Sequence, residues 1–406
     1  MLTADRRIDR RILLEADALE ADGWNVRIVA MPLDEDDAAP DPRVVRLGIS
    51  TRQNPKEAAI LGIYRKTRRL LPMNSTAMQW MKAFTWRHLI DQERFYLDLF
   101  LAEALRHPSS IVVAHDLPML PVACAAARSF GAKVVYDSHE LFSEQEFSEP
   151  EKRRWRAIET KYFGEAAEII TVNQTIAAEL EKRYDRNGVH VILNAEKPFD
   201  PKEKPSHLRD NLSIDKSHVI GLFQGGLSDG RNLGQLIDAM RILGRDDVHL
   251  VFLGDGQLKQ QLKQKASASG LLGNVHFLDA VPQQTLLSYT ASADFGVIPY
   301  IANCLNTEYC TPNKLFEFIA AGVPIVSSNL PELRRFVGDF KLGLLVNFED
   351  PHAVAGALEL LVRDTAAREG FKANTLAARQ QISWDVEAVK LRAIFSPLRS
   401  TARNTN

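Results

Sequence analysis

Residues 308–332 read EYCTPNKLFEFIAAGVPIVSSNLPE, and this stretch decides the fold. A Pro-Asn-Lys opens an apolar helical segment, an Ala-Gly pair ends it, and a short β-branched run follows. Proline is favoured at the start of a helix and glycine just past its end. A helix, a glycine turn and a buried strand in this order are typical of the repeating unit of a parallel α/β sheet.

The same alternation extends in both directions from this stretch. In the second half we expect strands at 219–224, 248–253, 274–278, 294–299, 323–327 and 342–347, and helices at 231–243, 257–268, 283–291, 313–320, 331–337 and 351–363. In the first half we expect strands at 25–30, 110–114, 133–137, 168–172 and 189–193, with helices such as 9–22 and 174–184. The pattern predicts an α/β protein of two doubly wound, Rossmann-like units facing a cleft, at residues 1–195 and 218–382.

Two segments lie outside these units. Residues 196–217 carry three prolines and many charges without apolar periodicity, which predicts a linker. Residues 383–406 contain a C-terminal helix that either covers the second unit or crosses back to the first, and periodicity leaves both readings open.

Composition excludes several classes of protein. The formal net charge of −2 over 406 residues is not that of a polyanion binder, so we expect no nucleic-acid partner. Three cysteines are too few for a disulfide framework, and none has partners at zinc-ligand spacing. The charged start does not resemble a signal peptide and no run of 18 apolar residues occurs, so we expect a cytoplasmic protein.

The helix predicted to begin near Asn313 suits a phosphate. Its first amides and the positive end of its dipole would lie at the tips of the strands, where an anion binds well. Lys314 adds a positive charge, and Glu317 on the same face could accept both hydroxyls of a ribose. The alternative is an ordinary amphipathic helix that carries a surface Lys–Glu pair.

A second anion-binding signal lies in QGGLSDGRN, residues 224–232. Gly225 and Gly226 allow the backbone to approach a ligand closely, and Arg231 can grip two phosphate oxygens. Gly254 ends the next strand in a similar but weaker pattern. The alternative for each loop is a plain glycine turn between a strand and a helix.

Two histidine-acid pairs follow strands of the first half. His115 and Asp116 come after one strand, and His139 and Glu140 come after the next. A histidine there could bind sugar hydroxyls or move a proton, and otherwise it is satisfied within a buried turn. No Asp-x-Asp ends a strand and no carboxylates cluster, so we expect no metal site.

With these residues in place, the sequence resembles the family-4 type of GT-B glycosyltransferases. The run GGLSDGRNL, VHLVFLGDG and TPNKLFEFIAAGVPIVSSNLPEL is similar to the donor domain, and KVVYDSHELF and ITVNQTIAAEL are similar to the acceptor domain. The resemblance implies a GT-B fold and retaining transfer of a sugar from a nucleoside diphosphate, most often UDP. It implies a glycan or lipid-linked acceptor, no cofactor, and front-face transfer in which the leaving phosphate activates the acceptor hydroxyl.

The resemblance also assigns roles. Glu317 matches the glutamate that holds the ribose, Arg231 matches a diphosphate-binding lysine, and Asn313 and Lys314 match the helix start that faces the donor. His139 matches a histidine near the transferred sugar, and with Glu140 it forms the expected catalytic pair. The expected acceptor-side residues are Asp9, Arg11, His115 and Asp116.

The sequence departs from the family at two positions. The family's first motif glutamate falls at Tyr309, with Glu308 one residue out of register. The family's diphosphate arginine falls at Gly226, and Lys314 would supply the missing charge. Two other functions therefore stay open, a sugar-nucleotide epimerase of the same fold and a non-catalytic sugar-binding subunit of a glycan assembly system.

Residues 52–87 carry eight positive charges against Glu57 alone, interleaved with or followed by large apolar residues. Basic residues attract anionic lipid and tryptophan favours the membrane interface, so one reading is peripheral contact with the inner face of a membrane. In the other reading the aromatic residues fill the core of the first unit and the basic residues line an acceptor groove.

Overall fold

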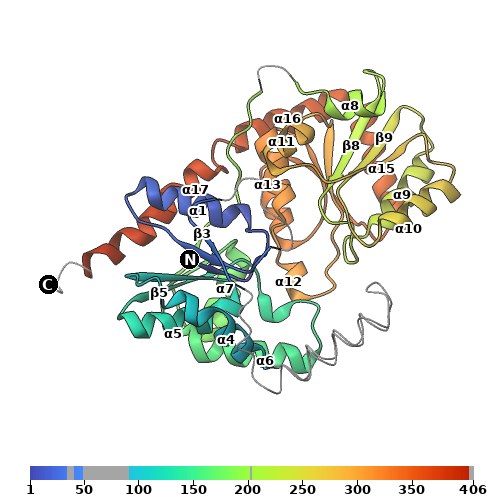
Figure 1. Ribbon diagram of the computed structural model, residues 1–406. Coiled ribbons are helices and arrows are strands. Elements are labelled where there is room, and N and C mark those ends of the chain that lie inside the picture. The colour runs from blue at the N-terminus through green and yellow to red at the C-terminus, as the bar shows by residue number, and fades with distance from the viewer. Residues whose placement is uncertain (34–40, 49–90, 202–203, 402–406) are drawn as a thin grey trace. The chain divides into compact units, whose positions relative to one another are not determined.

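The computed structural model describes residues 1–33, 41–48, 91–201 and 204–401 (Figure 1). The chain divides into two compact units. Unit 1 comprises Met1–Thr171, Ala177–Val191 and Leu391–Asn406, and unit 2 comprises Val172–Ile176 and Ile192–Lys390. We describe each unit by itself. The basic segment at 52–87 lies outside the described residues, and none of the described helices is long and apolar enough to cross a bilayer.

Unit 1 contains a parallel sheet in the order β3-β2-β1-β4-β5-β6-β7. Its strands are β1 (Leu2–Thr3), β2 (Ile28–Ala30), β3 (Val44–Arg46), β4 (Ile111–His115), β5 (Lys133–Ser138), β6 (Ala166–Thr171) and β7 (Val189–Val191). The helices are α1 (Arg10–Ala21), α4 (Gln92–Ala104), α5 (Leu120–Phe130), α6 (Glu149–Phe163) and α7 (Gln174–Tyr184), whose first turn belongs to unit 2. The five expected strands are confirmed. The sequence analysis missed β1 and β3, because two or three residues are too short to show a pattern.

Unit 2 repeats the design with the order β10-β9-β8-β11-β12-β13, again all parallel. Its strands are β8 (Val219–Gln224), β9 (Val248–Leu253), β10 (Val275–Leu278), β11 (Phe295–Ile298), β12 (Ile325–Ser328) and β13 (Gly343–Val346). The main helices are α9 (Leu233–Leu243), α10 (Lys259–Ala268), α11 (Gln283–Ala291), α13 (Asn313–Ala321), α15 (Pro351–Arg363) and α16 (Thr365–Ala378). All six expected strands are confirmed.

Strand β9 shows why this sheet is covered on both faces. Val248, Leu250 and Phe252 belong to one hydrophobic cluster, and Val251 and Leu253 belong to another. Successive side chains of a strand point to opposite faces, so a strand with apolar side chains on both faces requires helices on both sides. The two clusters are the two halves of the unit 2 core.

The predicted linker at 196–217 is not a plain connection. It contains the short helix α8 (His207–Leu212), whose Leu208 is fully buried, and Ile214 joins the same hydrophobic cluster. The prolines and charges of this segment concealed a short helix whose apolar residues, Leu208 and Leu212, pack against that cluster. The helix expected at 331–337 is also divided, into α14 (Pro331–Leu333) and a π-helical turn at Arg334–Gly338.

The C-terminal segment belongs to both units. Helix α17 (Trp384–Phe395) begins in unit 2, where the amide of Trp384 donates to the carbonyl of Glu196 at 2.9 Å. From Leu391 onward the chain belongs to unit 1. There Phe395 packs edge-on against Trp24 with ring centroids 6.2 Å apart, and the Arg399 guanidinium lies 4.6 Å from the same ring.

Each sheet has one point at which the strand order reverses. In unit 1 it lies between β1 and β4, and in unit 2 it lies between β8 and β11. Connections leave toward opposite sides at such a point, which opens a crevice at the carboxyl ends of the strands where ligands bind. The topology therefore predicts one ligand-binding crevice in each unit.

The loop after β9 can be tested by one substitution. Gly254 has φ +149°, and a Cβ on it would lie 2.1 Å from the carbonyl oxygen of Gly225. We expect Gly254→Ala to lower the free energy of unfolding by at least about 1–3 kcal/mol, because strain at such a backbone position is of that size. The midpoint of thermal unfolding by circular dichroism measures the change.

The matched control is Gly356→Ala in α15, where a Cβ meets nothing within 4 Å. Alanine is the better helix former by about 1 kcal/mol, so this variant should be as stable as the parent or more so. A Gly254→Ala protein that melts with the parent would contradict the close contact between the two loops.

Candidate functional site

The reversal point of unit 2 collects the predicted donor residues. Strand β8 ends at Gln224 and is followed by Gly225, and Tyr300 follows β11. Helix α13 begins at Asn313, as expected, with Pro312 as its N-cap. The N-cap residue Pro312 makes no side-chain hydrogen bond to the first turn of α13. The first backbone amides of the helix, which point toward the reversal point, therefore have no side-chain cap.

Lys314 is buried at this point, with only 6% of its surface exposed. Its ammonium donates to the Tyr300 hydroxyl at 2.9 Å and lies 4.5 Å from the centre of the Phe223 ring. The Arg231 guanidinium lies 4.1 Å from the centre of the Tyr300 ring, which the Lys314 ammonium approaches to 4.7 Å. Lys314 and Arg231 thus both lie against one aromatic ring.

The electrostatics of this pair favour an anion. Burial lowers the pKa of Lys314 to about 7, and the nearby Arg231 charge acts in the same direction. Burial also raises the pKa of the Tyr300 hydroxyl, so that group stays neutral. A doubly charged anion placed here would relieve the repulsion between the two cations.

Glu317 is fixed by a chain of hydrogen bonds. It is buried, with 7% exposed, and its carboxylate accepts from the side-chain amide of Gln224. The Thr290 hydroxyl in turn donates to the Gln224 side-chain oxygen at 2.9 Å. The alternative of a surface Lys–Glu pair on α13 is therefore wrong, because both side chains are buried and each has its own partner.

The glycine loop leaves room for Lys314. Gly225 has φ +112°, and a Cβ there would lie 3.5 Å from the Lys314 ammonium. Gly226 is exposed beside it, and Arg231 stands two residues before α9 and not at its first turn as expected. The Asn313 side-chain oxygen accepts from the side chain of Asn194 at 3.1 Å, so the start of α13 is bound to a residue 119 positions earlier in the chain.

The first departure from the family pattern, at Glu308 and Tyr309, lies just before α13. Glu308 is the last residue of the short helix α12 (Leu305–Glu308), and Tyr309 follows it. The main-chain carbonyl of Tyr309 accepts from the Asn173 side chain at 2.8 Å. Asn173 therefore fixes the backbone at the position where the family carries its first glutamate.

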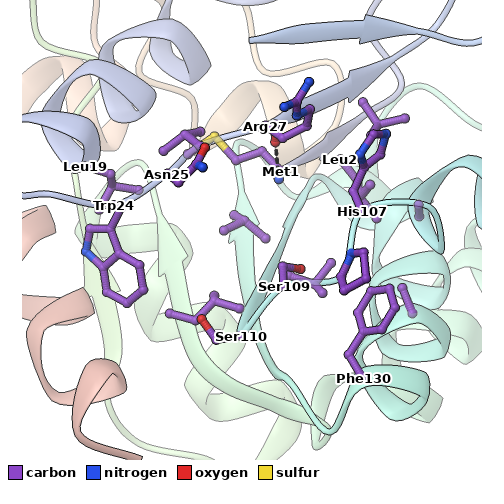
Figure 2. A pocket seen from close by; sticks show the side chains of 18 of the residues that line it. Met1, Leu2, Leu19, Trp24, Asn25, Arg27, His107, Ser109, Ser110 and Phe130 are labelled. Carbon is purple, nitrogen blue, oxygen red and sulfur yellow. Dashed lines mark hydrogen bonds between the residues drawn. The ribbon is translucent and has the colours of Figure 1, made fainter. Parts of the chain in front are cut away.

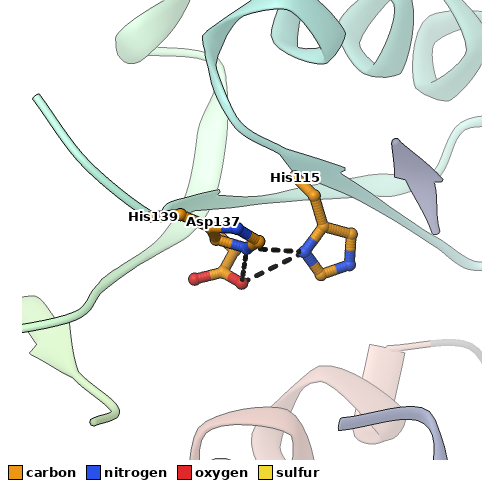
Figure 3. A group of neighbouring side chains, drawn as sticks. All are labelled: His115, Asp137 and His139. Atoms are coloured by element: carbon orange, nitrogen blue, oxygen red, sulfur yellow. Dashed lines mark hydrogen bonds and ion pairs between the residues drawn. The ribbon is translucent and has the colours of Figure 1, made fainter. Parts of the chain in front are cut away.

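In unit 1 a second cluster stands at the carboxyl ends of β4 and β5 (Figure 3). One oxygen of Asp137 lies 2.9 Å from His139 Nε2 and 3.1 Å from His115 Nδ1. The two imidazole nitrogens lie 3.2 Å apart. Because the carboxylate can only accept, both histidines are oriented to donate to it.

Helix α1 supplies the counter-charge of this cluster. Arg11 is 2% exposed and binds both oxygens of Asp137, at 3.0 Å and 2.8 Å. Its guanidinium also lies 2.9 Å from the buried carboxylate of Glu15. Asp9 accepts from the amide of Arg11 at 2.7 Å and is the N-cap of α1. Two of the four predicted acceptor-side residues lie here, and Arg11 positions Asp137 while Asp9 caps the helix.

The two histidines differ in protonation at neutral pH. Burial lowers the pKa of His115 to about 4, so its imidazole is neutral. Burial opposes the charge of His139 as well, but Asp116 and Asp137 outweigh it and raise its pKa to about 10. Burial likewise works against ionised Asp137, and Arg11 with His139 overcomes it and holds the pKa of Asp137 well below its usual range.

The loops after β4 and β5 hold the remaining predicted residues. Asp116 adopts φ 63°, a strained conformation for a non-glycine residue, and its carboxylate accepts from the amide of His139 at 2.9 Å. The carboxylate of Glu140 accepts from the side chain of Gln145. The structure therefore brings His115, Asp116 and His139 together, and it directs Glu140 toward Gln145.

His115, Asp137 and His139 also have the residue types of a metal site. Their nearest ligand atoms lie within 4.8 Å of one another, the one such trio in the part of the chain that the structure describes. Arg11 already binds both oxygens of Asp137, and His139 is protonated at neutral pH. A divalent cation would have to displace a guanidinium and a proton, so the donor set suits a charge network better than a metal.

A separate cavity of about 520 Å³ lies at the amino ends of the unit 1 strands, opposite the end that holds the histidine cluster (Figure 2). Its lining includes Met1, Arg27 and Ser110, which stand at or before the amino ends of β1, β2 and β4. The Met1 amine donates to the Arg27 carbonyl at 2.8 Å within it. None of the predicted site residues lines this cavity.

The sequence analysis missed Gln224, Asp137 and Tyr300. The first two are the last or next-to-last residue of a buried strand, and Tyr300 lies two residues beyond one. A polar side chain at the carboxyl end of an apolar run was the available signal, because that end of the strand faces the ligand crevice.

Comparison with known proteins gives two family matches. Residues 8–195 match the family described as glycosyl transferase 4-like domain, and residues 219–364 match the family described as glycosyl transferases group 1. The first curated relatives are matched over only part of their own length, between 45% and 62%. Both halves of this chain are thus similar to glycosyltransferase domains.

Three similar proteins illustrate the match. A phosphatidyl-myo-inositol mannosyltransferase of Mycobacterium leprae is 31% identical over 43% of this chain and 45% of its own length. A Campylobacter jejuni alpha-1,4-N-acetyl-D-galactosaminyltransferase, named for an undecaprenol-diphosphate-linked acceptor, is 24% identical over 81% of this chain and 85% of its own. The structure of Anabaena HepE in complex with UDP has TM-score 0.68, 17% identity and 98% coverage of both chains, and the fold is GT-B.

The charge state of His139 can be measured directly. We expect its imidazole resonances in NMR to titrate at about pH 10 in the parent protein. Asp116→Asn should lower this pKa by about 1–2 units, because it removes one of the two carboxylates that stabilise the charged ring. As a control, Glu165→Gln changes a carboxylate elsewhere in unit 1 and should leave the titration unchanged. A parent pKa near the ordinary histidine value of about 6.5 would contradict the assignment.

Proposed function

We propose that this chain, both halves of which match glycosyltransferase domain families, transfers a sugar from a nucleoside diphosphate to an acceptor hydroxyl. Unit 2 would bind the donor at its reversal point, and unit 1 would bind the acceptor. The observation that carries the proposal is the buried Lys314 ammonium, which shares the Tyr300 ring with Arg231 beside the uncapped start of α13.

This arrangement supplies what a diphosphate needs. Lys314 and Arg231 would provide two positive charges, and the first amides of α13 would provide backbone donors. Gly225, with φ +112°, lets the backbone approach the ligand closely. The same groups would stabilise the charge that develops on the leaving diphosphate during transfer. No cofactor beyond the donor enters this scheme.

The nucleoside would be held by Glu317. Its carboxylate is oriented by Gln224 and Thr290, and a fixed carboxylate is suited to accept both hydroxyls of a ribose. UDP is the nucleotide that we propose, because the structurally similar HepE was solved with UDP bound. The ordering of Glu317 by two further side chains would keep the ribose in one position.

We propose transfer with retention at the anomeric carbon, by front-face attack. The raised pKa of His139 keeps the imidazole protonated, so it can donate to a sugar oxygen but cannot act as the general base near neutral pH. The proton of the acceptor hydroxyl would therefore pass to an oxygen of the leaving diphosphate. Arg11 and Asp137 would hold His139 in its donating orientation.

A glycan or lipid-linked acceptor is supported by the similar proteins, whose names include a phosphatidyl-myo-inositol and an undecaprenol-diphosphate glycan. We propose a cytoplasmic enzyme that contacts the inner face of a membrane through the basic segment at 52–87. Basic side chains near an anionic surface contribute about 1 kcal/mol each to such binding.

Nucleotide binding tests the donor site. We expect Lys314→Ala and Glu317→Ala each to weaken UDP binding by about 10- to 150-fold, because a lost charged hydrogen bond costs about 1.5–3 kcal/mol. Isothermal titration calorimetry gives the dissociation constants. The matched controls are Lys372→Ala and Glu369→Ala, an exposed Lys–Glu pair at the same spacing on α16.

The control variants should bind UDP as the parent does. Parent-like affinity in both Lys314→Ala and Glu317→Ala would remove the donor site from α13. If titration of the parent protein with UDP, GDP, ADP and dTDP gives no more heat than titration with buffer alone, the proposed activity itself is wrong.

The proposed chemistry needs no divalent cation, since side chains and amides neutralise the diphosphate. Once a donor and acceptor are in hand, transfer should keep more than about half of its rate in excess EDTA, because Lys314, Arg231 and the helix amides replace the metal. The initial rate with and without added Mg²⁺ or Mn²⁺ measures this. Loss of transfer in EDTA and recovery with either metal would contradict the scheme.

A further inference from the structure

We infer that donor binding is coupled to proton uptake at Lys314, an inference that rests on the proposed function. The Lys314 side chain would wait as a neutral amine in the nucleotide-free protein. It would take one proton from solvent as the diphosphate binds, becoming the ammonium that contacts the phosphates. The proton would return to solvent when the nucleotide leaves.

The surroundings of the Lys314 nitrogen favour the neutral form. It lies between the rings of Phe223 and Tyr300 and has the Tyr300 hydroxyl as its hydrogen-bond partner. Within the described residues no carboxylate lies within ion-pair distance of this nitrogen. A charge that is removed from water without a carboxylate partner shifts its pKa and loses its proton.

Among the described residues, the chargeable neighbours of Lys314 are Arg231, Glu317, Cys310 and Tyr300. Arg231, from the turn before α9, repels a second cation. Glu317, one turn further along α13, attracts it, and its carboxylate also accepts from Gln224. Cys310, from the segment before α13, is a thiol whose ionised form would also attract the cation, and Tyr300 stays neutral.

These influences place the titration in the physiological range. Burial and Arg231 lower the pKa of Lys314 from its ordinary value of 10.5 to about 7. Below that pH the amine is already charged, and binding takes up no proton. Above it the amine is neutral, so binding must draw a proton in and grows weaker as pH rises.

The diphosphate supplies the opposite shift. An adjacent opposite charge typically moves a pKa by about 1–3 units toward the charged form, and a diphosphate carries two such charges. Lys314 in the complex would therefore be protonated up to about pH 9 or above. Between the two pKa values the affinity should fall about tenfold for each pH unit, the slope that one linked proton produces.

Calorimetry on the full chain tests the inference. The ligand is a UDP-sugar without acceptor, because its diphosphate has no terminal phosphate that titrates in this range. The heat of binding is measured at about pH 8.5 and about pH 6, each in several buffers of different ionisation enthalpy. The slope of the observed heat against the ionisation enthalpy of the buffer gives the number of protons exchanged on binding. We expect close to one proton taken up per UDP-sugar at the higher pH and close to none at the lower.

Variants identify the group. Lys314→Met should bind more weakly, with no proton uptake and an affinity independent of pH, and Lys314→Arg should also show no uptake because arginine stays charged. Cys310→Ser should keep the uptake of the parent protein. Proton uptake that persists in Lys314→Met, or disappears in Cys310→Ser, would overturn the assignment to Lys314.

The parent protein decides the question even if a variant fails to fold. UDP-sugar binding at about pH 8.5 without proton uptake overturns the inference and leaves the donor site in place. If no nucleotide sugar binds at any pH, the proposed function fails first, and the inference fails with it.

Discussion

One interaction underlies the proposed donor site: the Lys314 side chain is buried against the rings of Phe223 and Tyr300, beside the Arg231 cation. A protein gains no stability from placing a cation there, because the desolvation and the repulsion from Arg231 both oppose it. The surrounding structure maintains the arrangement by covalent connection and packing. Lys314 is the second residue of a helix whose other side chains, including Leu315, Phe316 and Phe318, fill the unit 2 core. A site held in this way would bind the anion of the proposed donor, because a carboxylate partner for Lys314 is missing among the described residues.

Unit 1 solves the opposite problem. Its buried charges are paired, since Asp137 receives two bonds from Arg11 and one from each histidine. The result is a fixed, protonated His139 next to the reversal point of the sheet, in a loop held by the strained Asp116. In the proposed scheme the two units share the chemistry: unit 2 would hold cations for the diphosphate of the sugar nucleotide, and unit 1 would hold the protonated His139 for a hydrogen bond to a sugar oxygen.

Much of this architecture was readable from the sequence, because apolar strands and glycine turns depend on local patterns. The helix start at Asn313 and all six strands of unit 2 followed from such patterns. The tertiary contacts could not be predicted from the sequence. Nothing in the order of residues says that Tyr300 meets Lys314, or that Arg11 meets Asp137 across 126 positions. The burial of Lys314 and Glu317 also required the fold, because a Lys–Glu pair at this spacing is usually exposed. The short helix α8 was not predicted for the same reason, since Leu208 and Leu212 stabilise it only through contacts with the core.

The central claim is that a nucleoside diphosphate sugar binds at the reversal point of unit 2. Photolabelling with a 5-azido-UDP-sugar, with and without excess UDP, followed by peptide mapping, tests it most directly. The account predicts UDP-protected label on peptides within 219–364, in particular those that carry the Gly225 loop or the start of α13. Protected label confined to Met1–Thr171 would contradict it.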